Sequence, residues 1–148
     1  MAAIRTAEAS WSGDLQSGSG MLLYVSSGAL ARQPISWAAR TEDHGGKTSP
    51  EELLAAAHAS CFSMAFAARL GKNGTPPDNL QVTAKVTFDN PGDGWKVTSS
   101  ALTVRGKVPG IDEAKFRELA DDAKDNCPIS IALKGNVELS VDATLESS

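Results

Sequence analysis

The chain has one long apolar segment, residues 49–70, whereas short stretches of alternating hydrophobic and polar residues occupy much of the remainder. The segment reads SPEELLAAAHASCFSMAFAARL, and its length favours a helix over a strand. Ser49 suits the N-cap, Pro50 the first helical position, and Glu52 completes a capping box, while two glycines after residue 70 predict the end. Because the segment is apolar on almost every side, we expect a buried central helix.

The alternating stretches predict strands, separated by turns rich in glycine, serine, asparagine and proline. A second helix is expected after Pro109-Gly110, with Ile111 at its start, and a short third helix opens at Pro128. Strands and helices are segregated along the chain, which favours an α+β fold in one domain, residues 1–148. The expected strands cover residues 2–11, 21–26, 35–40, 81–88, 95–105 and 137–143.

Composition narrows the possible partners. A net charge of -4 over 148 residues argues against nucleic acid or an anionic membrane as the main partner. Polar residues interrupt the longest apolar run, so no transmembrane helix is expected. The N-terminal residues lack the charged and apolar regions of a signal peptide, which makes the cytoplasm the expected compartment.

The chain has two cysteines, Cys61 in the middle of the apolar helix and Cys127 in the sequence NCPIS. A lasting structural disulfide is not expected in the cytoplasm, so these thiols are either inert core residues, catalytic groups or a redox switch. Zinc binding is disfavoured because the two cysteines and two histidines lack ligand spacing. A thioredoxin-like exchanger is disfavoured because there is no C-x-x-C motif.

Local electrostatics make Cys127 the better nucleophile. It precedes Pro128 at the start of a possible helix, where the positive end of the helix dipole favours a thiolate. Burial in an apolar helix is expected to raise the pKa of Cys61 unless a cation reaches it. His58 lies one turn before Cys61 and is a possible base or ligand, although a packing role is commoner for such a histidine.

Several motifs resemble those of the OsmC/Ohr family, and together they cover nearly the whole chain in order. The long helix resembles the central family motif, which usually has Asn at the position of Ser49, and CPISxAL resembles the second cysteine motif. The N-terminal AxWSGDLxxGxG and the VPGID before the second predicted helix also match. This resemblance favours functional thiols over inert ones.

The resemblance implies a thiol peroxidase that reduces organic hydroperoxides and, less well, hydrogen peroxide. Cys61 would be the peroxidatic thiol and Cys127 the resolving thiol, with Arg40 and Glu51 completing the catalytic set. The Ohr branch carries its arginine in an N-terminal GRDG motif, which is WSGD here, so the OsmC branch fits better. In that branch Arg40 matches an R-F-E motif, although Thr41 replaces the phenylalanine.

The chemistry of these residues is coherent. Arg40 would supply the cation that Cys61 lacks, and Glu51 would orient the guanidinium through a bidentate pair. The peroxide pocket should be apolar, and candidate wall residues are Phe62, Met64 and Trp37, although ordinary core packing is the commoner role for each. Without the resemblance, Arg40 would be interpreted as a solvated loop charge and Glu51 as an acid that suits the helix N-terminus.

The family fold implies antiparallel sheets wrapped around a long central helix, in an intertwined homodimer with active sites at the subunit interface. Helix geometry agrees with a shared site. Glu51 and Cys61 are ten residues apart, about 15 Å along a helix, so one arginine can hardly touch both. We therefore expect the Arg40–Glu51 pair and Cys61 of one site to come from different subunits.

The predicted function is a hydroperoxide reductase in oxidative or osmotic stress defence, working through a Cys61 sulfenic acid and a Cys61–Cys127 disulfide. An external dithiol, in the family often a lipoylated protein, would restore the thiols. No metal, nucleotide or flavin motif is present, so no bound cofactor is expected. The alternative is a non-enzymatic redox switch or stress-induced binding protein on the same fold.

Overall fold

The computed structural model describes residues 1–146, which form two compact units with a boundary after Leu53. The first unit holds strands β1, β2 and β3 and helix α1. The second holds strands β4, β5 and β6 and helices α3 and α4, while helix α2 (Pro50–Lys72) runs through the boundary. The fold class, α+β with a long helix, is confirmed; the single domain over residues 1–148 stays a prediction.

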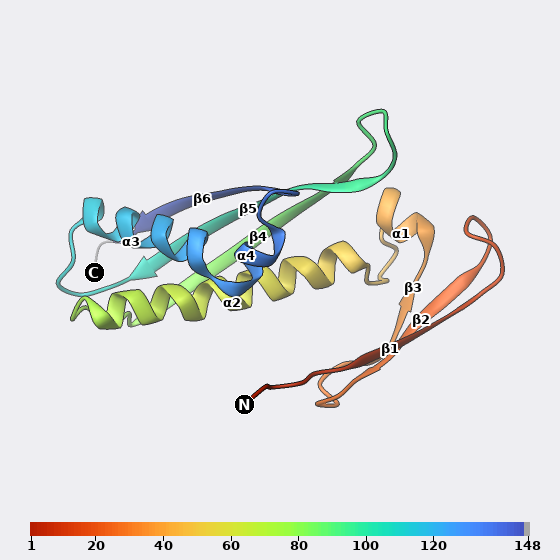
Figure 1. The fold of residues 1–148 in the computed structure, drawn as a ribbon, viewed down its shortest axis with the longest axis horizontal. Helices are drawn as coiled ribbons and strands as arrows, with labels where there is room; N and C mark the ends of the chain where they lie inside the picture. The colour runs from red at the N-terminus through yellow and green to blue at the C-terminus, as the bar shows by residue number, and fades with distance from the viewer. Residues whose placement is uncertain (147–148) are drawn as a thin grey trace. The chain divides into compact units, whose positions relative to one another are not determined.

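The first unit is a three-stranded antiparallel sheet in the order β1 (Ala7–Ser12), β2 (Ser19–Val25) and β3 (Ala31–Ile35), drawn in red to orange in Figure 1. The strand predicted over residues 35–40 is wrong, because the chain turns there into helix α1 (Trp37–Thr41). The cause is local: the Ser36 hydroxyl accepts a hydrogen bond from the backbone N–H of Ala39 at 3.1 Å, which caps the helix.

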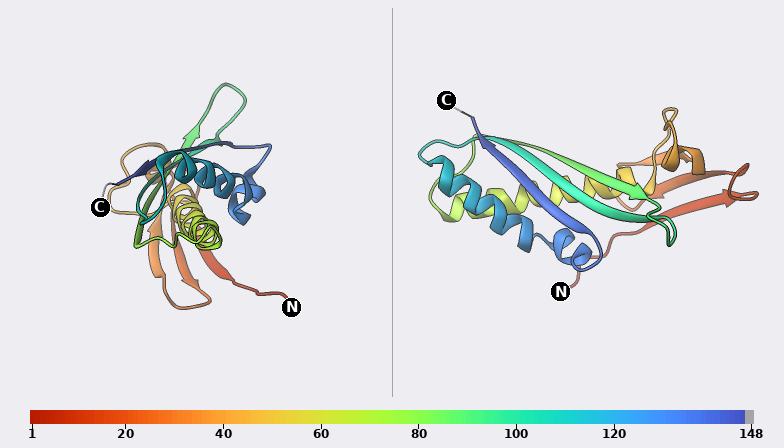
Figure 2. Two further views of the ribbon diagram at one scale, coloured as in Figure 1. Left: turned by 90° about the vertical axis from the view of Figure 1, so that its left-hand side faces the viewer. Right: turned by 90° about the horizontal axis from the view of Figure 1, so that it is seen from above.

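The second unit contains β4 (Asn79–Asp89), β5 (Lys96–Lys107) and β6 (Glu138–Leu145) in that spatial order. β4 and β5 form the expected antiparallel hairpin, but β5 and β6 are parallel, so the prediction of antiparallel sheets is wrong for that pair. Parallel neighbours need a crossover connection, which α3 (Glu113–Asn126) and α4 (Pro128–Leu133) supply. Helices α2 and α3 lie on the same face of this sheet (Figures 1 and 2).

The start and end of α2 follow the sequence signals. The Ser49 hydroxyl accepts from the Glu52 backbone N–H at 3.1 Å, and Gly74, with φ +81°, follows the last turn. The capping box is only half formed, because the Glu52 carboxylate accepts from the Thr48 hydroxyl at 2.9 Å. The side-chain cap of α2 among the described residues is therefore the Ser49 hydroxyl.

The prediction that α2 is buried on almost every side is wrong for the described chain. In the second unit a single stripe at four-residue spacing is fully buried, whereas the opposite face carries exposed small side chains and Met64, which is 68% exposed. The buried stripe consists of His58, Phe62, Phe66 and Leu70.

The core of the second unit forms where this stripe meets β5 and α3. The rings of Phe62 and Phe66 lie 5.5 Å apart and those of Phe66 and Phe116 5.0 Å apart, in the tilted arrangement that aromatic pairs favour. Leu102 and Val104 of β5 complete the contact. Phe62 is fully buried in this core, so it has the core-packing role that the sequence favoured over a pocket wall.

The sequence predicted no transmembrane helix. By length and composition alone, however, α2 is long and apolar enough to cross a membrane. The core helices of soluble proteins meet the same criterion, so the finding is weak evidence for a membrane span.

Candidate active site

The two cysteines, 66 positions apart in sequence, meet in the second unit. Cys61 lies on α2, and Cys127 is both the C-cap of α3 and the N-cap of α4. Both thiols are free, and they lie within interaction range of each other. Cys127 is fully buried, whereas Cys61 is half-buried. A more accessible thiol beside a buried one suits a pair in which the first reacts and the second condenses with it.

Burial raises the pKa of the Cys61 thiol, as expected for an apolar helical position. A backbone hydrogen bond from Ile129 acts in the opposite direction, and the neighbouring Cys127 raises the pKa further. Within this unit Cys61 therefore remains mostly a thiol at neutral pH, and its reactivity needs an added positive charge.

Cys127 has a polar environment despite its burial. Its sulfur accepts a hydrogen bond from the Ser130 backbone N–H at 3.4 Å and lies 3.2 Å from the Ser130 hydroxyl. These contacts arise because Pro128 opens α4 directly after Cys127, which turns the next backbone N–H groups back toward the sulfur.

His58 is fully buried between two serines. Its Nδ1 lies 2.6 Å from the Ser100 hydroxyl of β5, and its Nε2 lies 2.8 Å from the Ser130 hydroxyl of α4. Burial lowers the pKa of His58, so the ring is neutral at physiological pH. Since both ring nitrogens have partners, the ring is not free to ligate a metal. Neither serine was predicted from the sequence, where the CPISxAL motif is the one signal that includes Ser130.

Arg40 and Glu51 form the predicted bidentate ion pair within the first unit. Arg40 Nε lies 3.0 Å from Glu51 Oε1, and Nη2 lies 2.8 Å from Oε2. The Glu51 side chain is 10% exposed and that of Arg40 is 29% exposed, so the ion pair is largely buried. Its central carbon also lies 5.5 Å from the centre of the Trp37 ring, a cation–π distance. A carboxylate and an aromatic ring thus fix the position of the guanidinium.

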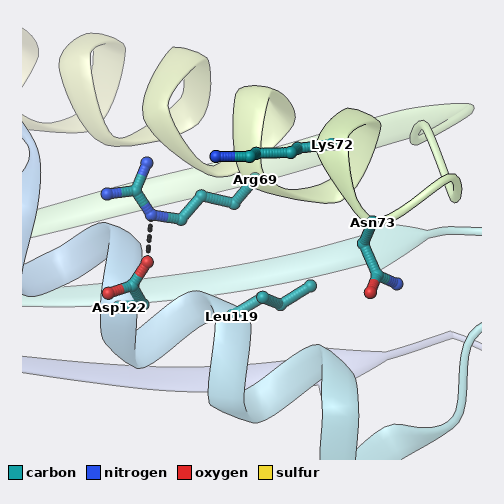
Figure 3. A pocket seen from close by; sticks show the side chains of 5 residues that line it. All are labelled: Arg69, Lys72, Asn73, Leu119 and Asp122. Carbon is teal, nitrogen blue, oxygen red and sulfur yellow. Dashed lines mark hydrogen bonds and ion pairs between the residues drawn. The ribbon is translucent and has the colours of Figure 1, made fainter.

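A recess of about 380 Å³ lies between the C-terminal end of α2 and α3 (Figure 3). Its lining includes Arg69, Lys72 and Leu119, and a hydrogen bond links Arg69 to Asp122. The lining contains neither thiol, and it lacks the apolar walls expected of a pocket for organic peroxides. Within residues 1–146, no group of three or more His, Cys, Asp or Glu side chains could hold a metal ion.

The family model described as OsmC-like protein matches residues 43–142. The chain belongs to the OsmC family. It is 41% identical over 132 residues to peroxiredoxin OsmC of Escherichia coli (strain K12). The matched region covers 89% of this chain and 91% of that protein. It is 31% identical over 100 residues to the organic hydroperoxide resistance protein of Xanthomonas axonopodis pv. citri, covering 66% of this chain and 67% of that protein.

Solved structures agree with this family. The crystal structure of the organic hydroperoxide resistance protein OhrB of Bacillus subtilis superimposes with a TM-score of 0.69 at 26% identity, covering 94% of this chain and 98% of that one. An OsmC-like protein from Mycoplasma pneumoniae gives a TM-score of 0.71 at 17% identity, which shows a shared fold alone. The resemblance drawn from the sequence motifs is therefore confirmed.

Proposed function

We propose that this protein is a thiol-dependent hydroperoxide reductase that acts on organic hydroperoxides and hydrogen peroxide. The observation that carries the proposal is the adjacency of two free thiols, Cys61 and Cys127, from distant parts of the sequence. Relatives named peroxiredoxin and organic hydroperoxide resistance protein support the same chemistry.

The reaction has three steps. The Cys61 thiolate attacks the peroxide, the O–O bond breaks, and the alkoxide leaves as an alcohol after taking a proton, while Cys61 becomes a sulfenic acid. Cys127 then attacks the Cys61 sulfur, so that a disulfide forms and the sulfenic hydroxyl leaves as water. An external dithiol reduces the disulfide and is itself oxidised.

Arg40 and Glu51 supply the charge that the thiols lack. Because burial raises the pKa of Cys61, its thiolate needs a cation, and a guanidinium beside it would also stabilise the departing alkoxide. α2 separates Glu51 from Cys61 by ten residues, about 15 Å. We propose that a partner subunit contributes the pair to each site, in a homodimer.

The exposed apolar face of α2 supports a homodimer. Ala56, Ala57 and Ala68 are exposed beside Met64 on the helix that carries Cys61. This face also includes the exposed Ser60 but no charged side chain between Ala56 and Ala68, and exposed apolar side chains grouped on a helix commonly mark an interface. A second copy of the chain would cover this face and place the partner's cation beside the thiol.

The remaining expectations complete the proposal. The reductant is an external dithiol, with lipoylated proteins as candidates, and no metal or nucleotide cofactor takes part. The protein would work in the cytoplasm during oxidative or osmotic stress, with neither nucleic acid nor a membrane as partner.

Peroxide consumption tests the proposal. Cumene hydroperoxide and hydrogen peroxide are supplied with dihydrolipoamide, and wild type is run beside Cys61→Ser and Cys127→Ser. We expect Cys61→Ser to abolish turnover and Cys127→Ser to oxidise once without efficient recycling. A disulfide that forms without turnover would favour the redox switch. Loss of the first oxidation in Cys127→Ser alone would make Cys127 the peroxidatic thiol.

Complementation tests the shared site. Arg40→Met and Cys61→Ser variants, each inactive, are mixed, dissociated and reassociated. If each site combines Arg40 of one subunit with Cys61 of the other, random pairing restores about one quarter of wild-type activity, because half of the dimers are mixed and each has one complete site. No recovery, with mixed dimers verified by mass, would place both residues of a site in one subunit.

A further inference from the structure

A continuous line of buried polar groups runs from β5 to the Cys127 sulfur. Ser100 contacts His58 Nδ1 at 2.6 Å, His58 Nε2 contacts Ser130 at 2.8 Å, and the Ser130 hydroxyl contacts Cys127 Sγ at 3.2 Å. All four residues are fully buried. The three-step reaction gives no role to His58, Ser100 or Ser130, although buried polar groups must be well satisfied to be tolerated.

The hydrogen of Ser100 decides which nitrogen of His58 is protonated. Among the described residues, the Ser100 hydroxyl has one hydrogen-bond partner, His58 Nδ1. If Nδ1 carried the ring hydrogen, the Ser100 hydrogen would be buried without an acceptor, which is costly. Ser100 therefore donates to Nδ1. A neutral imidazole has one donor nitrogen and one acceptor nitrogen, so Nε2 carries the hydrogen.

The direction of the next bond follows. Nε2–H donates to the Ser130 oxygen, so the Ser130 hydrogen points elsewhere, and Cys127 Sγ is the acceptor within reach. Burial lowers the pKa of His58 and keeps the ring in the neutral form that this arrangement requires. The Ser130 backbone N–H donates to the same sulfur. Two donors are thus aimed at the one sulfur that would carry the charge of an attacking thiolate.

We propose that the buried Ser100–His58–Ser130 chain directs the Ser130 hydroxyl at Cys127 and thereby activates Cys127 as the resolving nucleophile. Ser130 contacts the reacting sulfur, whereas His58 and Ser100 are positioning residues that act through it. The inference rests on the proposed function, because it assumes that Cys127 resolves a Cys61 sulfenic acid.

The step that this chain accelerates is disulfide formation. Cys127 gives up its proton, which ends on the departing hydroxide, and Ser130 donates a hydrogen bond to the resulting thiolate. The thiolate attacks the Cys61 sulfur, the S–S bond forms and the S–O bond breaks. The hydroxide that departs takes up a proton, so the net products are one disulfide and one water.

The test separates the two oxidative steps in a single turnover. Reduced full-length protein is mixed with one equivalent of cumene hydroperoxide without reductant. Samples are quenched over time with acid, and mass spectrometry quantifies the thiol, the dimedone-trapped sulfenic acid and the disulfide. The variants are Ser130→Ala and Ser100→Ala, and the matched control is Ser140→Ala, which removes an exposed hydroxyl from β6 of the same unit.

In Ser130→Ala we expect Cys61 to oxidise at the wild-type rate and disulfide formation to slow about tenfold, because a hydrogen bond to a charged sulfur is lost. The sulfenic acid then accumulates. Ser100→Ala should slow the same step less, because Ser130 keeps its hydroxyl and only the group that fixes the His58 tautomer is lost. The control should match wild type in both steps.

Two results would overturn the inference while leaving the peroxidase intact: an unchanged rate of disulfide formation in Ser130→Ala, or equal slowing of both steps, which indicates a structural role. If Ser130→Ala does not fold, Ser100→Ala tests the inference instead, through the rate of disulfide formation relative to the rate of Cys61 oxidation. If Cys61 of the wild type is not oxidised, the proposed function fails, and this inference fails with it.

Discussion

The two units of this chain differ in how much apolar surface each buries by itself. Among the described residues, Leu22 and Ala39 are the buried hydrophobic side chains of the first unit, and every residue of β1 is exposed. The second unit has a continuous core, with the aromatic side chains of α2 and α3 packed on β5. The second unit therefore has a continuous hydrophobic core, whereas the first buries few hydrophobic side chains among its described residues.

The candidate site residues are also distributed between the two units. The two thiols and the buried His58 lie in the well-packed unit, where small changes of geometry are resisted. The Arg40–Glu51 pair belongs to the unit with little core. The proposed nucleophile and the proposed cation thus lie in different units, which agrees with the proposal that a partner subunit completes each site.

The largest expected effect tests the core of the second unit. Replacing Phe66 with Ala should destabilise the protein by about 3–5 kcal/mol, because the ring contacts Phe62 and Phe116 and is fully buried. Leu22→Ala, in the first unit, should cost about 2 kcal/mol, the low end for such a truncation. Urea unfolding followed by circular dichroism measures both, and an equal loss would remove the contrast between the units.

The next effect tests the cation of the first unit. Arg40→Lys should lower kcat/KM for cumene hydroperoxide about 100-fold, because an ammonium cannot hold Glu51 in a bidentate pair while it stabilises the thiolate. Arg105→Lys is the matched control, since Arg105 pairs with Gln81 on the exposed side of the second unit's sheet. Arg40→Lys with wild-type kinetics would remove Arg40 from the mechanism.

A smaller effect is expected in how the free energy of unfolding depends on pH, through the buried His58. Burial lowers the pKa of His58 below its ordinary value of 6.5, so the unfolded chain binds a proton more readily than the folded chain. The free energy of unfolding should therefore decrease as pH falls below about 6.5, the unfolded value. Urea unfolding between pH 7 and pH 5 measures this slope, which should be shallower in His58→Gln. His44→Gln, in an exposed loop, should retain it, and a slope that His58→Gln leaves unaltered would contradict the prediction.

The smallest effect sets a baseline for surface charge in the second unit. Arg117 pairs with Glu113 one turn earlier on α3, at 2.6 Å, and both side chains are more than half exposed. Arg117→Ala should change the free energy of unfolding by less than about 0.5 kcal/mol, because water screens exposed helix pairs. A larger loss would mean that surface charge contributes to the stability of this unit.

Much of the fold was predictable because its signals are local. The Ser49 cap, the glycines after α2 and the alternation of β4 and β5 depend on neighbouring residues, and the elements form close to where they were expected. The strand predicted over residues 35–40 failed because the Ser36 cap outweighs a short apolar run. The parallel pairing of β5 with β6 could not be predicted from alternation, which is the same for both directions.

The sequence by itself determined the family, the residue types of the site and the two local motifs that carry the thiols. Only the tertiary structure decided which groups meet. It placed Cys127 beside Cys61 and closed the Arg40–Glu51 pair. It also enclosed His58 between Ser100 and Ser130, serines 42 and 72 positions away. The physical reason is that hydrogen-bond partners and desolvation depend on distance in space, and residue spacing along a chain encodes such distances only within one helix or strand.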